Sequence, residues 1–138
     1  LYAHFPDDRA LFMACSAHNL EQNPRPEAEA WKSIADRDER LRAGLTELYR
    51  WYADNEKMTA SVLRDVEVSP LLQEIGKIRI APFYKAYREV LGEKLNARQQ
   101  AMLALALSFH TWRTLVRDGG LSTKAAAEQM TRAVIGAK

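Results

Sequence analysis

The sequence predicts an all-α domain. Apolar residues recur at the 3.6-residue spacing of a helix along almost the whole chain, and no stretch keeps the alternating pattern of a half-buried strand. Helix-start signals precede most of these periodic stretches. At 138 residues, with 47% hydrophobic and 28% charged residues, the chain has the size and composition of one soluble globular domain. We predict six to seven helices joined by short loops.

The first half of the chain contains three predicted helices. The first starts at "PDDRAL" with Asp7 as its cap, and it ends before "NPRP" because two prolines in three residues cannot continue a helix. The segment "EAEAWKSIA" is compatible with either a turn or a short helix. Asp36 with Glu39 resembles a capping box and starts the next helix, and Asn55 opens a short third one.

The second half contains three longer predicted helices. Ser69 caps the first of them, in whose middle Pro82 removes a backbone hydrogen bond and predicts a kink. Asn96 caps the longest helix, "ARQQAMLALALSFHTWRTLVRD". Ser122 starts the last helix, "TKAAAEQMTRAVIG".

Composition excludes several classes of protein. A formal net charge of +2 is too small to indicate nucleic-acid binding by this segment itself. The longest uncharged apolar stretch, around "AMLALALSFHTW", is too short to cross a bilayer. The single cysteine, Cys15, excludes an internal disulfide and is compatible with a reducing compartment, so we predict a cytoplasmic location.

Motifs for catalysis are missing from the sequence. None of the three histidines has an acidic residue three or four positions before it, and there is no Cys-x-x-Cys pair or glycine-rich phosphate loop. We therefore predict a protein that is not an enzyme, with no metal and no cofactor. A metal-dependent oxidase built on a helical bundle and an interaction module without an effector are the alternatives.

Aromatic residues cluster in three of the predicted helices. The functional interpretation is a cavity: the helix with Pro82 bows away from its neighbours, and amphipathic aromatic side chains line the space. Core packing is the alternative for each of these residues, and for Cys15 a buried thiol on the apolar face of its helix. Arg79 would hold an anionic group. The predicted effector-binding residues are Cys15, His18, Tyr49, Tyr52, Met58, Ile75, Arg79, Phe83, Tyr87, Phe109, His110 and Arg113.

The last two predicted helices are apolar on more than one face. A helix of that kind must be buried on most sides, which favours a self-complementary interface in which two helices from each protomer form a four-helix bundle. A tightly packed core within one chain is the alternative. The predicted homodimer interface comprises Leu103, Leu107, Thr114, Met130 and Val134.

The opening segment "LYAHFPDDRALFMAC" resembles the end of the DNA-binding unit in TetR-family transcriptional regulators. The match is Leu1-Tyr2-x-His4-Phe5, followed by Ala10-Leu11. The segments "ERLRAGLTELYRWYADNEKM", "VLRDVE" and "FHTWRTLVRDGGLS" resemble the C-terminal regulatory domain of that family more loosely. The resemblance implies two parts: residues 1–5 are the end of the DNA-recognition helix, and residues 6–138 are an effector-binding and dimerisation domain.

The resemblance also implies a function. A ligand-responsive repressor of this family binds a small amphipathic effector, dimerises through its last two helices and contacts operator DNA through helices that precede this segment. Tyr2 and His4 would contact operator phosphates, which position the protein without reading base sequence. One departure is Asp8, where the family often has a lysine that also contacts phosphate.

Overall fold

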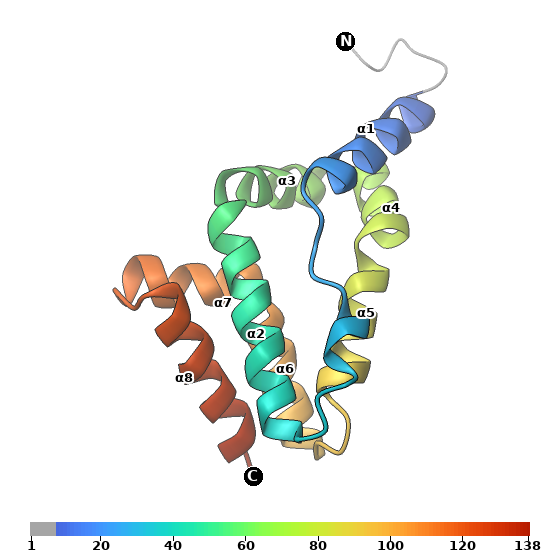
Figure 1. The fold of residues 1–138 in the computed structure, drawn as a ribbon. Helices are drawn as coiled ribbons and strands as arrows, with labels where there is room; N and C mark the ends of the chain where they lie inside the picture. The colour runs from blue at the N-terminus through green and yellow to red at the C-terminus, as the bar shows by residue number, and fades with distance from the viewer. Residues whose placement is uncertain (1–7) are drawn as a thin grey trace.

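The computed structural model describes residues 8–138, and over that range the chain forms α-helices and no strand (Figure 1), which confirms the all-α prediction. The helices are α1 (Asp8–Gln22), α2 (Arg37–Asp54), α3 (Glu56–Val68), α4 (Pro70–Arg79), α5 (Ala81–Leu91), α6 (Ala97–Leu107), α7 (Phe109–Arg113) and α8 (Thr123–Gly136). A single 3-10 turn, η2 (Ala28–Trp31), precedes α2, and a π-helical turn, η3 (Thr114–Asp118), follows α7.

Helix-capping side chains lie where the sequence predicts them. Four capping residues each accept a hydrogen bond from the backbone N–H three residues further on, at 2.9 to 3.2 Å: Asp36, Ser69, Asn96 and Ser122. At Asn96 the capping box is complete, because the Gln99 side chain also accepts the Asn96 backbone N–H. These starts depend only on neighbouring residues, which is why a local pattern suffices to place them.

The predicted kink at Pro82 is a complete break between two helices. α4 ends at Arg79 and α5 begins at Ala81, with Pro82 in its first turn. Proline has no N–H to donate and its ring crowds the carbonyl one turn earlier, so the chain stops one helix and starts another.

The longest predicted helix is also divided, at Ser108. This residue has extended backbone angles (φ −71°, ψ 133°), and its Oγ accepts the His110 N–H at 3.2 Å to cap α7. Serine offers its own side chain as a hydrogen-bond partner and so competes with the helical backbone. The two breaks give eight α-helices over residues 8–138, where we predicted six to seven for the whole chain.

The core forms around α2, which packs against α8 and also contacts α6 and α7 (Figure 1). Four of the five predicted interface residues are buried in this core, within one chain: Leu103, Leu107, Met130 and Val134. α8 and α6 therefore bury their apolar faces against α2 and against each other, which corrects the prediction that these side chains are left for a second protomer. The fifth residue, Thr114, is exposed.

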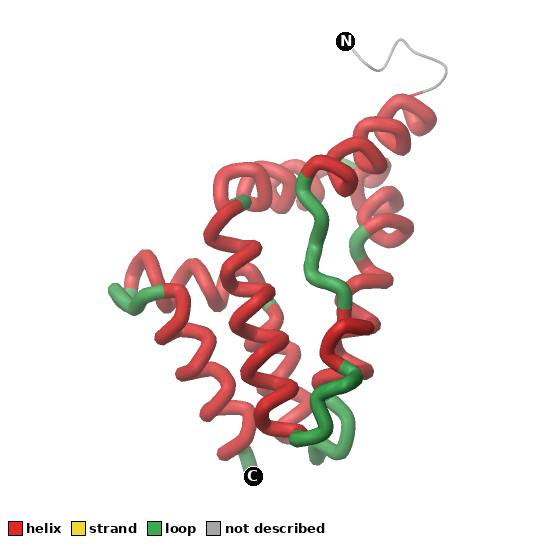
Figure 2. Tube along the Cα trace, in the orientation of Figure 1, coloured by secondary structure: helices red, strands yellow, loops and turns green. Residues whose placement is uncertain are grey.

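α1 lies apart from this core and packs chiefly against α4. None of its residues is buried by the part of the chain that the structure describes. Residues 23–27, which we call the strap, run from the end of α1 down to η2 beside α5 (Figure 2). The predicted Asp7 cap and the predicted phosphate contacts Tyr2 and His4 lie outside the described residues.

No helix within residues 8–138 is long and apolar enough to cross a membrane.

A candidate ligand-binding groove

The predicted effector-binding tyrosines are core residues. Tyr49, Tyr52 and Tyr87 are fully buried, and each hydroxyl donates to a backbone carbonyl. Tyr49 donates to Ala106 at 2.7 Å and Tyr52 to Leu107 at 2.5 Å. These two bonds join α2 to the end of α6, so the tyrosines hold helices together.

Burial raises the pKa of all three phenols well above the ordinary value. The charged phenolate is disfavoured in the low-dielectric interior. These hydroxyls therefore stay neutral donors at physiological pH. Phe109 and Ile75, two more of the predicted effector residues, are also buried.

The other predicted effector residues lie at the edge of the core or on the surface. Cys15, His18 and His110 are exposed, and four residues are half-buried: Met58, Arg79, Phe83 and Arg113. The exposed Cys15 corrects the expectation of a buried thiol, because α1 turns no face into the core. The set predicted from sequence is therefore not brought together in one cavity.

Arg79 has a structural partner where a ligand was predicted. Its Nη2 donates to the Met13 carbonyl at 3.1 Å and its Nε to Ser16 Oγ at 3.3 Å. An exposed ion pair between Arg9 and Glu74, at 2.8 Å, adds a second link between the same two helices. Arg79 thus fastens α1 to α4.

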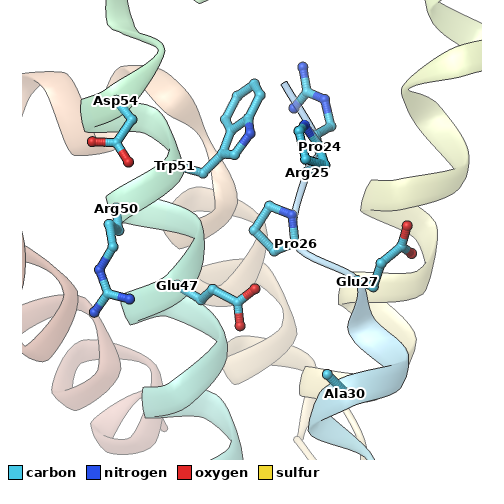
Figure 3. A pocket seen from close by; sticks show the side chains of 9 residues that line it. All are labelled: Pro24, Arg25, Pro26, Glu27, Ala30, Glu47, Arg50, Trp51 and Asp54. Atoms are coloured by element: carbon cyan, nitrogen blue, oxygen red, sulfur yellow. The ribbon is translucent and has the colours of Figure 1, made fainter. Parts of the chain in front are cut away.

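A groove with a volume of about 380 Å³ lies between the strap and α2 (Figure 3). The volume is in the range of small-molecule sites. Its lining residues are Pro24, Arg25, Pro26, Glu27, Ala30, Glu47, Arg50, Trp51 and Asp54. Trp51 and Glu47 reach from α2 toward the strap, whereas Arg50 points away from it (Figure 3).

Two hydrogen-bond donors in this groove have no acceptor. The Arg25 guanidinium carbon lies 4.2 Å from the centroid of the Trp51 ring, a cation–π contact. Trp51 is 8% exposed, and its Nε1 is buried without a partner among the described residues. Arg25 Nε is likewise buried and has no hydrogen-bond partner among the described residues. Because a desolvated donor left unpaired costs free energy, an acceptor entering here would be stabilised.

The charged side chains of the groove are also unpaired. Among residues 8–138 none of Arg25, Glu27 and Glu47 forms an ion pair, although both signs of charge line the same hollow. One carboxylate oxygen of Glu47 accepts a hydrogen bond from the Trp31 indole N–H at 3.1 Å, which leaves the second oxygen for another donor.

A second hollow, between α2 and α8, is the opposite case. Arg42 and Glu128 line it and bond to each other at 2.7 Å. The hydrogen bond from Arg42 lowers the pKa of the Glu128 carboxyl, so that the pair is charged and mutually satisfied at neutral pH. Of these two hollows, the groove under the strap is the one that contains both unsatisfied hydrogen-bond donors and unpaired charges.

The strap is held in place from α5. The Tyr87 hydroxyl donates to the Pro26 carbonyl at 2.5 Å, and the Tyr87 ring lies 5.3 Å from that of Trp31. The wall of the groove is therefore fixed at Pro26, next to Arg25, whose guanidinium lies over the Trp51 ring.

Sequence reasoning missed the groove because its two walls are about 25 residues apart in the chain. The available signal was "NPRPE", an arginine held between two prolines, which is the composition of a stiff surface segment. The described residues contain no cluster of three or more side chains suited to hold a metal ion. The groove can bind and orient a molecule, and its side chains offer no nucleophile with an adjacent base.

No family model, curated protein or solved structure matches the chain.

Proposed function

We propose that the chain is the effector-binding and dimerisation domain of a TetR-like, ligand-responsive transcriptional repressor. The observation that supports this most is the attachment of α1. It follows directly after the segment that resembles the end of a DNA-binding unit, it buries no residue in the described part of the chain, and polar side chains link it to α4. A helix attached in this way can change its tilt at little cost in buried surface.

The effector site in this proposal is the groove under the strap. The strap continues directly from α1, so a molecule that grips Arg25 acts three residues from the end of that helix. Such a molecule favours one tilt of α1 over another, which is a shift between two populations. A tenfold change in operator affinity needs about 1.4 kcal/mol of differential binding.

Homodimerisation, the second half of the proposal, uses the outer faces of α6 and α8. Leu105 on α6 is a large apolar residue that is 50% exposed, and Ala101 and Ala104 beside it are also exposed. These small residues allow a close approach of a second helix pair. The two tilting α1 helices would then set the spacing of two recognition helices, which operators require to be about 34 Å.

Sedimentation velocity tests the dimer. We expect the chain to sediment at about twice 15.7 kDa, and Leu105→Glu to dissociate it without unfolding because the side chain is already half-exposed. The matched control is Val68→Glu, which changes an 84% exposed apolar residue on α3 and leaves the dimer intact. A monomeric parent chain, or a dimer that tolerates Leu105→Glu, contradicts the proposed interface.

A further inference from the structure

The charges of the groove have an order along its length. Arg25 lies at one end, over the Trp51 ring, and Glu47 reaches from α2 toward the strap near the other end (Figure 3). The Glu27 side chain extends from the strap away from α2, and Arg50 and Asp54 are the remaining charged lining residues. Glu47 precedes Trp51 by four residues on α2, which is about 6 Å along a helix axis. The Trp51 ring under Arg25 and the Glu47 side chain are therefore about one helical turn apart along α2.

Four apolar residues also line the groove. Pro24 and Pro26 come from the strap, Ala30 from η2 and the Trp51 ring from α2. Proline rings are stiff, so these wall residues lose little conformational entropy when an aliphatic chain packs against them.

From this arrangement we infer that the groove binds an elongated amphoteric molecule, with a carboxylate at one end and an ammonium group at the other. The carboxylate accepts hydrogen bonds from Arg25 and from the indole N–H of Trp51. The ammonium group donates to Glu47. This inference rests on the proposed effector role of the groove, and it adds the chemical class of the effector.

Three observations favour this class over simpler ligands. The two unsatisfied groups beside each other, Arg25 Nε and Trp51 Nε1, are both donors, so the group that fits there is an acceptor. A plain carboxylate would leave Glu47 without a cationic partner and would be repelled by it. A plain amine would leave Arg25 without a partner and would be repelled by it.

A matched triad of probes tests the inference: ω-aminohexanoate, hexanoate and hexylamine, with glycine as a short amphoteric control. Binding is followed through the indole N–H resonances, of which Trp51 is identified by its loss in Trp51→Phe. We expect aminohexanoate to move the Trp51 resonance and to bind about tenfold more tightly than hexanoate or hexylamine, a difference of about 1.4 kcal/mol. Glycine, too short to reach both ends, should not move it.

Charge-removing variants sharpen the test. Arg25→Gln should abolish the preference for aminohexanoate over hexylamine, and Glu47→Gln should abolish the preference over hexanoate. Glutamine at 47 still accepts the Trp31 N–H, so the groove keeps its shape. Arg88→Gln and Glu67→Gln, which remove one exposed charge of each sign elsewhere, are the controls and should change neither preference.

Two results would overturn the inference: equal binding of the three probes, or no shift of the Trp51 resonance at millimolar aminohexanoate. These two results test the ligand class, and they can be distinguished from a failure of the proposed regulatory function. If aminohexanoate binds with the expected preference while α1 keeps its position, the ligand class stands and the regulatory role does not.

Discussion

The two ends of this molecule are held by different forces. The body, formed by α2 with α6, α7 and α8, is held by buried apolar side chains and by tyrosine hydroxyls bonded to backbone carbonyls. α1 is held by two arginines and by half-buried side chains on α4. Apolar burial is lost only by unfolding, whereas a few hydrogen bonds exchange with water at little net cost. We therefore expect α1 to change its position more readily than the body does.

A leucine-to-alanine substitution in the body and one in α1 should differ most in their effect on the free energy of unfolding. Leu45 on α2 is fully buried and Leu11 on α1 is 39% exposed. We expect Leu45→Ala to lower the free energy of unfolding by about 2–5 kcal/mol, because it removes buried methyl groups and leaves a cavity. Leu11→Ala should cost no more than about 0.5 kcal/mol. Urea denaturation measures both, and equal losses would mean that α1 belongs to the core.

A second contrast appears at alkaline pH. The raised pKa values of Tyr49, Tyr52 and Tyr87 mean that these phenols ionise more readily in the unfolded chain than in the folded one. Their stabilising effect is complete below the ordinary pKa of 10.0 and is lost as the pH rises above it. The expected slope is about 1.4 kcal/mol per pH unit for each phenol.

Unfolding measured between neutral pH and pH values above 10 checks this slope. Tyr49→Phe lowers stability at neutral pH, since it removes the bond to Ala106, and it should also make the alkaline slope shallower. A slope that Tyr49→Phe leaves unchanged would show that this phenol ionises without unfolding the body.

Releasing α1 should have the smallest global effect. Arg79→Gln removes the bonds to Met13 and Ser16, and we expect a loss of about 1 kcal/mol or less in the free energy of unfolding. Amide hydrogen exchange should increase in α1 and stay unchanged in α2. Arg88→Gln on α5 is the control. Faster exchange throughout the body would contradict the separation of the two ends.

The elements that the sequence predicts well are those decided by neighbouring residues. Asp36, Ser69, Asn96 and Ser122 cap helices because their side chains reach a backbone N–H only three residues away. The break at Ser108 escapes such reasoning because apolar residues continue with helical spacing on both sides of it.

Burial and the candidate site depend on which elements meet, and periodicity does not specify that. Cys15 lies on the more apolar side of its helix, yet it is exposed, because no core element within residues 8–138 covers it. Tyr49 and Tyr87 are of a residue type that often lines ligand sites, but here each hydroxyl donates to a backbone carbonyl of another segment. The groove needs Arg25 and Trp51, which approach each other only when the strap lies along α2.

The central claim is that a ligand in the groove changes the position of α1 relative to the body. Cys15, the single cysteine and an exposed one, accepts a spin label on α1, and Lys124→Cys on the exposed start of α8 provides a second label on the body. Pulsed electron paramagnetic resonance then measures the distance between the labels, with labelled chain diluted in unlabelled chain so that only pairs within one protomer contribute. We predict that aminohexanoate shifts this distance distribution in the parent protein and leaves it unchanged in Arg25→Gln. An unchanged distribution while the Trp51 resonance shows the groove to be occupied would contradict the account.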